Sequence, residues 1–440
     1  MDDHFSGLRG TTAAELADEL RTLIERSILA PGTVLPPVRG LADLLGMNRN
    51  TVVAAYRQLA AGGLVESRGR AGTRVSGAAR SAQEGFAANS VLRDIGSGNP
   101  DPARIPDPSH ALAHAVGRPI LYGEAVVDSD LERWAHEWIR SDLQPAEIAL
   151  TITSGAVDAV ERLLAQALVR DDAVALEDPC FLASIHTVRL GGYRAVAVPV
   201  DDEGMTVAGL RAALDAGVRA IVVTPRAQNP TGASLTPRRA ADLRAVLADH
   251  PYVLIVEDDH FSMLSRAPYE SLIGPHHRRF ALVRSVSKFL GPDMCLAVTA
   301  SDPDTATRLG LRLSPGTTWV SHILQRLVVG LVTDSGVLAE IDAAAAHYAA
   351  RNTAFADAAA AAGLPVVASD GLNVWLPLPV PARAAAEQLM RRGWLARTGD
   401  EFRLGSEAPS HHLRLTVHEL GDDERAALVS DLVSSIAAAS

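Results

Sequence analysis

The feature that most constrains the fold is an alternation of short β-prone runs with helical stretches, which begins at Ile148. Strands interleaved with helices are typical of α/β proteins whose sheet is largely parallel. Ligands of such sheets bind beyond the carboxyl ends of the strands, so the residues that follow each run are candidate site residues. In chain order the runs are "IALTIT", "AVALE", "AVAVPV", "AIVVT", "YVLIVE", "ALVRSVS" and "CLAVTA".

Three of these positions suit parts of a flat, phosphorylated ligand. Ser154, Gly155 and Ala156 follow the first run and open a helix, whose free N–H groups and dipole attract an anion such as phosphate. Phe181 lies in "DPCF", after the second run, where its aromatic face can cover a ring. Asn229 lies in "PRAQNPTG", and its side chain can form a hydrogen bond with a ring hydroxyl.

Two further positions supply a carboxylate and an amine. Asp258, Asp259 and His260 follow "YVLIVE", and Ser287 and Lys288 follow "ALVRSV". Lys288 is the only lysine of the chain, because 40 of the 41 basic residues are arginines. A bias toward arginine explains the forty. The single lysine reflects either chance or a need for a primary amine, since arginine cannot form an imine.

Together these positions supply a phosphate cradle, a stacking face, an oxygen partner, a carboxylate and an amine. That set is what pyridoxal 5'-phosphate (PLP) requires. Taken singly, each has an ordinary structural interpretation: "NPTG" is a turn, "DD" is a solvated strand end, and a Ser-Gly pair caps a helix. Their combination, in chain order at successive strand ends, predicts a PLP site.

A separate helical domain is predicted at the amino terminus. The segment "TTAAELADELRTLIERSIL" has apolar residues at helical spacing through Ile28. Thr12 and Glu15 are placed as a capping box at its start. This segment predicts a first helix.

A helix-turn-helix follows. A second helix is predicted from about Val38 to Leu45, ending at Gly46, and a third begins after Asn48. Two short helices joined by a tight glycine turn fit a helix-turn-helix. The segment "GLVESRGRAGTRVS" predicts two short strands of a wing. The residues expected on the buried side of the third helix are Val52, Tyr56 and Leu59.

The charge of this region suits DNA. Between Leu35 and Gly77 there are six arginines and two acidic residues, although the whole chain has a formal net charge of −11. The alternative is a protein-interaction module with solvated arginines. The stretch "LPPVRGLADLLGMNRNTVVAAYRQLAAGGLVESRGRAGTRV" resembles the GntR-type winged helix, which implies DNA binding. The residues that match the DNA contacts of that family are Arg39, Arg49, Asn50, Thr51, Arg68 and Gly69.

The remainder, through the motifs above with "SGNPDPARIPD", "LYGEAVV" and "GTTWVSHILQ", resembles fold type I aminotransferases over roughly residues 94–438. The fusion with a GntR-type winged helix is similar to the MocR group of transcriptional regulators. The resemblance implies an α/β fold with a mainly parallel sheet and a smaller carboxyl-terminal α+β part. The expected domains are a winged helix over 1–77, a linker over 78–93, and a PLP-binding effector and dimerisation domain over 94–440.

The resemblance also implies roles for single residues. It places Lys288 as the imine-forming lysine and Asp258 on the pyridine nitrogen, with Asn229 near the ring hydroxyl. Arg414 in "HHLRLTV" stands where aminotransferases bind a substrate carboxylate. The other implied contacts are Phe181 on the ring, Ser154, Gly155, Ala156, Ser285 and Ser287 at the phosphate, and Tyr122 at the phosphate of the partner subunit.

Three departures from the family pattern bear on cofactor affinity. Cys295 stands where the MocR pattern has a phosphate-binding arginine, so a charge-assisted contact is lost unless Arg284 substitutes. His260 stands where a tyrosine commonly contacts the ring hydroxyl; histidine can still donate, but its charge depends on pH. The segment after Tyr122 lacks the usual glycine and arginine.

The leading functional hypothesis is a DNA-binding regulator that senses PLP through an imine with Lys288. The resemblance implies a target in vitamin B6 salvage, the gene for pyridoxal kinase. Two alternatives stay open: an aminotransferase that also binds DNA, which Arg414 favours, and a regulator whose aminotransferase domain is inactive and structural, which Cys295 favours. The domain is expected to serve as an effector sensor rather than as a working enzyme.

Location and assembly complete the expectations. The start "MDDHFSGLRG" is acidic and has no apolar core, and no apolar run approaches the roughly 20 residues that span a bilayer, so a cytoplasmic protein is expected. Cys180 and Cys295 are expected to be reduced there. A homodimer is implied by the resemblance. No metal site is predicted.

Overall fold

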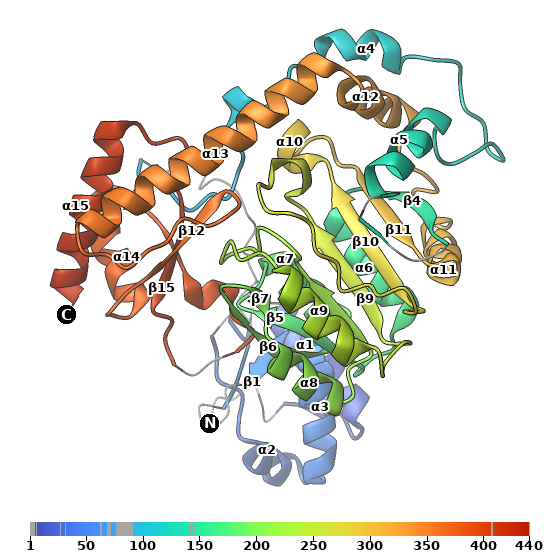
Figure 1. Ribbon diagram of the computed structural model, residues 1–440. Coiled ribbons are helices and arrows are strands. Elements are labelled where there is room, and N and C mark those ends of the chain that lie inside the picture. The colour runs from blue at the N-terminus through green and yellow to red at the C-terminus, as the bar shows by residue number, and fades with distance from the viewer. Residues whose placement is uncertain are drawn as a thin grey trace. The chain divides into compact units, whose positions relative to one another are not determined.

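The computed structural model describes residues 5, 7–26, 28–30, 32–61, 64–67, 72–75, 91–140, 142–143, 147–405 and 408–439 (Figure 1). The chain forms two compact units, an amino-terminal unit and a larger second unit. None of the described helices is long and apolar enough to cross a membrane.

The amino-terminal unit contains the predicted first helix. The predicted capping box is present, since the Thr12 side chain accepts from the Glu15 N–H and the Glu15 carboxylate accepts from the Thr12 N–H. The helix buries Leu16 and Leu20. It ends before Ile28, which is 42% exposed, so extending the helical pattern to Ile28 was wrong. The elements of this unit are α1 (Ala13–Glu25), α2 (Val38–Leu45), α3 (Arg49–Ala61), β1 (Val65–Ser67) and β2 (Thr73–Val75).

The helix-turn-helix and the wing also form as predicted. Helix α2 ends at Gly46, whose φ of 65° lies in the left-handed region that favours glycine. Strands β1 and β2 pair in antiparallel fashion. The tip of the wing, with Arg68 and Gly69, lies outside the described residues. The expected buried face of α3 is confirmed for Val52, Tyr56 and Leu59.

The second unit is built on an eight-stranded sheet of order β4-β11-β10-β9-β8-β5-β6-β7. Neighbouring strands from β10 to β6 are parallel, and β11 and β7 run antiparallel to their neighbours. The predicted largely parallel sheet is therefore confirmed. The strands are β4 (Ala149–Thr153), β5 (Ala173–Asp178), β6 (Arg194–Asp201), β7 (Gly204–Met205), β8 (Ala220–Val223), β9 (Leu254–Asp259), β10 (Phe280–Ser285) and β11 (Ala297–Ser301).

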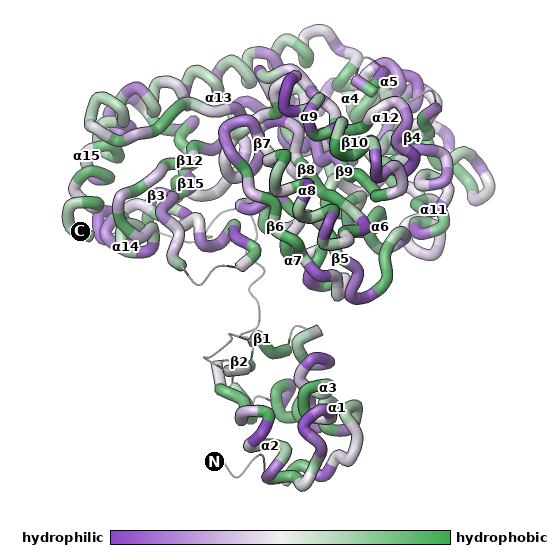
Figure 2. Tube along the Cα trace, turned by 60° about the horizontal axis from the view of Figure 1, so that its bottom comes forward, coloured by the Kyte–Doolittle hydropathy of each residue, from purple (hydrophilic) through white to green (hydrophobic). Residues whose placement is uncertain are grey.

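Helices cover the sheet. Every residue of β8, β9, β10 and β11 is buried, as expected for parallel-type strands covered on both faces. Hydrophobic residues predominate along these central strands (Figure 2). The helices of this part are α4 (Ser109–Ala115), α5 (Ser129–Arg140), α6 (Ala156–Ala167), α7 (Leu182–Leu190), α8 (Val207–Asp215), α9 (Pro237–Leu247), α10 (Ser287–Leu290), α11 (Pro303–Leu313) and α12 (His322–Val332).

A smaller α+β part with its own core completes the unit, as predicted. The long helix α13 leads from the sheet layer to it (Figure 1). Strands β12, β15 and β14 form one small sheet. Strand β13 pairs with β3, which is the first described strand of the second unit in chain order. The elements are β3 (Arg93–Asp94), α13 (Ser335–Ala361), β12 (Asn373–Pro377), α14 (Ala382–Arg391), β13 (Trp394–Leu395), β14 (Arg397–Thr398), β15 (His412–Thr416) and α15 (Asp422–Ala439).

Candidate functional site

The sheet gathers the predicted amine and carboxylate at one edge. Strands β9 and β10 are parallel neighbours, and Asp258 lies opposite Val283 in their register. Lys288 follows three residues after the end of β10, in the short helix α10. Lys288 lines one pocket together with Asn229 and His260. Three of the predicted cofactor residues, from separate strand ends, therefore share one pocket.

The Lys288 amine contacts a loop that the sequence did not single out as a site. Its Nζ atom donates to the carbonyl oxygen of Gly98, at 2.9 Å. Gly98 belongs to the segment that leads from β3 toward α4 and also lines the pocket. The lysine is half-buried, so its amine remains within reach of a ligand in this pocket.

Asp258 is buried with one carboxylate oxygen unsatisfied. The residue is 5% exposed, and its Oδ1 atom has no hydrogen-bond partner among the described residues. Burial, and secondarily the charge of Asp259, raise the pKa of Asp258 to about 7, although Lys288 acts in the opposite direction. A buried carboxylate without a partner favours a ligand that donates a hydrogen bond or carries a positive charge.

Asn229 and Arg414 meet deep in the pocket region. Arg414 Nη1 donates to Asn229 Oδ1 at 3.2 Å, and Arg414 Nη2 donates to Gly96 O at 2.6 Å. The guanidinium also lies 4.8 Å from the centre of the Phe402 ring. Arg414 is fully buried, so a carboxylate ligand would have to reach it through the space beside Asn229.

The predicted anion site lies at the start of α6. Gly155 precedes the helix with a φ of 94°, a conformation that favours glycine, and Ala156 is its first residue. The Ser154 N–H already donates to Asp158 Oδ2 at 3.1 Å. Asp158 in turn pairs with Arg162 at 2.6 Å. Asp158 lies in the first turn of α6, where a carboxylate is a common signal of a helix start, so the sequence contained a signal for this residue.

Two serines lie near the same edge. Ser285 ends β10 and is buried, and its Oγ accepts from the Ser287 N–H at 3.1 Å. Ser287 Oγ donates to Met294 O at 3.3 Å. Both side chains are thus held by the turn that carries Lys288. Their position is compatible with the predicted phosphate role, which stays a prediction.

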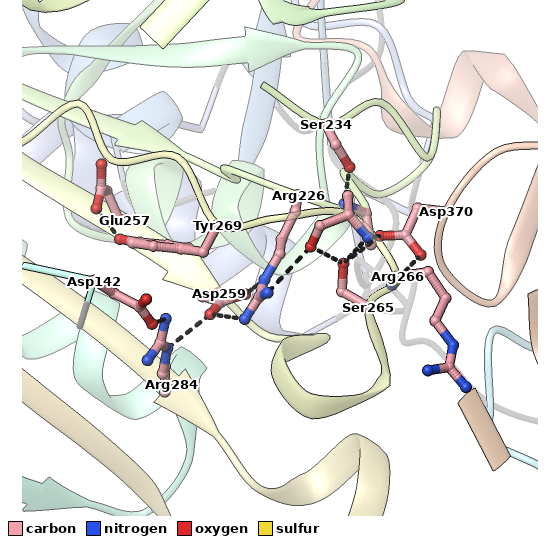
Figure 3. Close-up of polar contacts among 12 residues, drawn as sticks. Asp142, Arg226, Ser234, Glu257, Asp259, Ser265, Arg266, Tyr269, Arg284 and Asp370 are labelled. Carbon is pink, nitrogen blue, oxygen red and sulfur yellow. Dashed lines mark hydrogen bonds and ion pairs between the residues drawn. The ribbon is translucent and has the colours of Figure 1, made fainter. Parts of the chain in front are cut away.

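Arg284 does not stand in for the missing phosphate arginine, so that suggestion was wrong. The side chain is 1% exposed and donates to Asp259 Oδ2 at 2.8 Å and to Trp138 O at 2.9 Å. Its guanidinium lies 4.7 Å from the centre of the Tyr269 ring (Figure 3). Neighbours along a strand point to opposite faces, so Arg284 and Ser285 point to different layers. Cys295 is exposed and donates to Pro292 O at 3.3 Å.

Two polar residues that sequence reasoning missed support the pocket. Gln228, which lines it, donates through Nε2 to Pro179 O at 2.8 Å and to Glu177 Oε2 at 3.3 Å. Glu177 also accepts from the Thr224 N–H at 3.2 Å, and burial raises its pKa to about 8. These bonds join the segments that carry Phe181 and Asn229. The sequence signal was a glutamate at the end of a fully apolar strand.

Phe181 and Tyr122 keep their predicted roles as predictions. Phe181 lies immediately before α7 and is half-buried. Tyr122 is 89% exposed, and its ring lies 5.4 Å from that of Trp319. An exposed tyrosine is available to a second subunit, which is the role that the resemblance implies.

The predicted DNA contacts lie at the starts of two helices. Arg39 is the second residue of α2, with a side chain that is 76% exposed. Arg49 and Asn50 are exposed in the first turn of α3, where the Asn48 side chain accepts from the Asn50 N–H at 2.8 Å. Thr51 is half-buried. Exposed polar and basic side chains at a helix start can reach phosphates and base edges.

Comparison with known proteins accounts for both units. Residues 12–75 match the model of the bacterial regulatory proteins of the gntR family, and residues 95–430 match the model of aminotransferases of class I and II. The chain is 46% identical over 424 residues to the vitamin B6 salvage pathway transcriptional repressor PtsJ of Salmonella typhimurium, covering 96% of this chain and 98% of that protein. The chain belongs to the MocR-type regulators. In these a gntR domain precedes an aminotransferase domain.

Other matches agree with the MocR-type assignment. The pyridoxine biosynthesis transcriptional regulator PdxR of Corynebacterium glutamicum is 28% identical over 57% of this chain and 56% of that protein. The multiple substrate aminotransferase of Thermococcus profundus matches with a TM-score of 0.71 and 18% identity, over 80% of this chain and 92% of that one. LysN of Thermus thermophilus matches with a TM-score of 0.69 and 21% identity, over 79% and 93%. The structural matches show the aminotransferase fold.

The residues of this MocR-type pocket fit PLP at its reactive end. Lys288 lines the pocket and offers an amine, and Asp258, near the end of the neighbouring strand β9, offers a buried carboxylate oxygen that lacks a donor among the described residues. At the predicted phosphate end Cys295 offers no cation, and the Ser154 N–H and the Ser287 hydroxyl already donate to Asp158 and to Met294 O. The residues present therefore fit the aldehyde and the ring nitrogen of PLP better than they fit its phosphate.

Proposed function

We propose that this chain is a homodimeric, cytoplasmic transcriptional regulator that senses PLP at Lys288 and controls vitamin B6 salvage, through the gene for pyridoxal kinase. The observation that carries the proposal is the position of the only lysine and of a buried, unsatisfied Asp258 at the ends of adjacent strands. The same chain also carries a gntR domain. The names of PtsJ and PdxR support the link to vitamin B6.

Each residue of the pocket has a defined task in this proposal. Lys288 would hold PLP through its amine, and PLP, when bound, would supply an aldehyde that is reactive toward that amine and a protonated pyridine nitrogen that can donate a hydrogen bond. Asp258 accepts that hydrogen bond and stays ionised when a cation is beside it. Asn229 and His260 orient the ring through its hydroxyl. Phe181 covers the ring face.

The phosphate would be held by several weaker contacts. The backbone N–H groups of Gly155 and Ala156 would bind it at the positive end of the α6 dipole, and that of Ser154 would have to leave Asp158 to do so. Ser285 and Ser287 add hydroxyl donors, and Tyr122 of the partner subunit adds another. Without an arginine at position 295, we expect weaker PLP binding than in relatives that keep one. Such binding suits a sensor, which must release its ligand when the concentration falls.

DNA affinity would follow cofactor state through the dimer. A ligand shifts a conformational equilibrium only when it binds one state better than the other. The relevant difference is the separation of the two winged helices relative to the operator half-sites. The coupling is reciprocal, so operator DNA should also change the affinity for PLP.

The first experiment is an absorption titration of the purified protein with PLP, followed by borohydride reduction and peptide mapping. The proposal expects a visible imine band, fixed by reduction at Lys288, and its absence in Lys288→Ala. The second part measures the affinity for a duplex selected by the protein from random DNA, with and without PLP. Operator affinity that is the same with PLP, without it and in Lys288→Ala would overturn the sensing role. It would leave a regulator with a structural aminotransferase domain.

A working aminotransferase is the second candidate, because Arg414 lies beside Asn229 where a substrate carboxylate would be bound. Counting products separates the two. PLP-loaded protein mixed with a panel of amino acids should give many keto-acid molecules per site if it is an enzyme. A sensor should give at most about one per site.

A further inference from the structure

The segment of residues 95–101, here called the strap, crosses from the small α+β part to the cofactor pocket. It begins directly after β3, which pairs with β13. In sequence the strap follows β3, which itself follows the expected linker to the DNA-binding domain. Gly98 has a φ of 67°, a left-handed conformation that turns the chain at this point.

Most strap contacts come from β15 and the turn that follows it. Thr416 N donates to Ile95 O at 2.6 Å, and Gly98 N donates to Thr416 Oγ1 at 3.0 Å. Arg414 donates to Gly96 O at 2.6 Å. His418 Nε2 lies 3.0 Å from Asn99 O. These four bonds fix the strap to the small part, whatever occupies the pocket.

Lys288 makes a different kind of contact with the strap. Its Nζ atom donates to Gly98 O at 2.9 Å, and Lys288 belongs to α10, which follows the central strand β10 of the large sheet. The bond therefore joins the turn after a central strand of the large sheet to a strap that is also bound to β13, to β15 with the turn that follows it, and to α13. It is also a bond from an ionisable amine, which is stronger than one between neutral groups.

The same Nζ atom is the one that would form the covalent bond with PLP. In the condensation, the neutral Lys288 amine attacks the aldehyde carbon, a C=N bond replaces the C=O bond, and the carbonyl oxygen leaves as one water with the two amine hydrogens. An ammonium group has three N–H donors, whereas an imine nitrogen has at most one, and only when protonated. Asn229 and His260 line the same pocket, so these side chains and the bound ring would then determine where that nitrogen points.

We propose that the Lys288–Gly98 hydrogen bond is a latch between the large sheet and the strap, and that imine formation with PLP opens it. This inference rests on the proposed function and names the contact through which the site acts on the strap. With the latch closed, the strap is bound on both sides. With the latch open, the strap keeps its bonds to β15, to the turn after it and to Tyr348, and it loses its bond to α10.

Two substitutions at Lys288 separate the latch from cofactor capture. Lys288→Arg keeps a cationic donor for Gly98 O but cannot condense with an aldehyde. Lys288→Met keeps the length of the aliphatic stem and removes the donor. We expect the arginine variant to stay latched, and the methionine variant to stay open, with or without PLP.

The measurement is hydrogen–deuterium exchange of the strap in the full-length protein, read by mass spectrometry on the peptide that contains Gly98. A hydrogen bond from a charged donor is worth roughly tenfold or more in a local opening equilibrium. We expect exchange of this peptide to be about tenfold faster in Lys288→Met than in Lys288→Arg. PLP should accelerate exchange in the wild type to the methionine level and leave both variants unchanged.

Tyr348→Phe serves as a matched control. The Tyr348 hydroxyl accepts from the Asp101 N–H at 3.1 Å and makes no contact with Lys288 that the structure records. This variant should exchange faster at the carboxyl end of the strap, with the PLP response at Gly98 retained. That result would show that the strap peptide reports local opening. It would also show that loss of the Tyr348 contact does not reproduce the effect of PLP at Gly98.

The outcomes distinguish the latch from the sensor. Equal strap exchange in Lys288→Met and Lys288→Arg overturns the latch, even when the wild type shows an imine band at Lys288. A difference between the two variants without any PLP band shows that the hydrogen bond holds the strap, but it overturns both the opening by PLP and the proposed sensing function. As a second readout, the operator affinity of Lys288→Met should match that of PLP-loaded wild type, and that of Lys288→Arg should match the free protein.

Discussion

Arg284 donates through Nε to Asp259 Oδ2 at 2.8 Å, and the two side chains are 1% and 0% exposed. Arg226 binds the same carboxylate, at 2.8 and 2.9 Å, from the loop after β8 (Figure 3). The charge of Asp259 is thereby compensated on two sides, and its pKa is lowered in spite of burial. This ion cluster lies one residue away in the chain from both Asp258 and Ser285, so it anchors the two strand ends that carry the candidate site.

Removal of Arg284 should therefore destabilise the second unit. Arg284→Met leaves Asp259 with a single partner and costs about 3–5 kcal/mol of unfolding free energy, the usual range for breaking a buried ion pair. All five tryptophans lie in the second unit, so urea unfolding followed by tryptophan fluorescence reports that unit. Arg308→Met, which breaks an exposed pair with Asp304, should cost less than about 1 kcal/mol.

The stability of the PLP-free protein should fall as pH rises from about 6.5 to about 8, above the range in which histidines of lowered pKa, such as His418, act in the opposite direction. Burial raises the pKa of Asp258 and of Glu257 to about 7 and that of Glu177 to about 8, and each value is above the usual one. In that window the folded state binds more protons than the unfolded state, so the free energy of unfolding decreases with pH. Urea unfolding at pH 6.5 and pH 8 measures the difference.

Asp258→Asn tests which residue contributes. Each unit of pKa difference is worth about 1.4 kcal/mol, so this variant should regain up to about 4 kcal/mol at pH 8. The gain should come with a large loss of PLP affinity. Glu177→Gln should also gain stability but keep PLP binding, because Glu177 binds Gln228 and Thr224 rather than the ligand. A loss of stability at pH 8 in Asp258→Asn would contradict the assignment.

Cys295→Arg should strengthen PLP binding. A guanidinium at this position restores a charge-assisted contact, which is worth about 1.5–3 kcal/mol, or roughly ten- to a hundredfold in the dissociation constant. Cys295→Ser controls for loss of the thiol and should change little. The affinity for pyridoxal, which has no phosphate, should be the same in all three proteins. An equal gain for pyridoxal and PLP would place the arginine away from the phosphate.

Arg49→Ala should weaken DNA binding and reduce its salt dependence. Arg49 is exposed in the first turn of α3. If it contacts a phosphate, the slope of log K against log salt should fall by about 1, with similar losses on all sequences. If it reads a base, the loss should fall on one operator position. Arg21→Ala removes an exposed arginine of α1 that pairs with Asp18 and should change neither quantity.

The parts of the fold that the sequence predicted are those with local signals. Helix α2 and its end at Gly46 could be predicted, because a left-handed cap follows directly from a glycine at the end of an apolar pattern. The capping box of Thr12 and Glu15 is equally local. Ile28 was misplaced because its spacing continues the pattern of α1 past the point where the helix ends.

The contacts of the site depended on pairing between distant segments. Neighbouring residues of one strand, Arg284 and Ser285, serve different layers, and only the position of Asp259 on β9 shows which layer takes the arginine. The contact of Lys288 with Gly98 joins residues 190 positions apart. No pattern of spacing contains such a pair, although the residue types at the strand ends were sufficient to predict the pocket.

The lone lysine also makes the chain unusually simple toward reactive aldehydes. Exposed lysines of many proteins react with the PLP aldehyde, and those adducts form a background against which a specific signal must be measured. Here every other basic side chain is a guanidinium, so the only competing amine is the chain's own α-amino group. Occupancy of one pocket therefore equals the total lysine adduct, and the adduct that borohydride fixes on lysine is itself a direct count of occupied pockets.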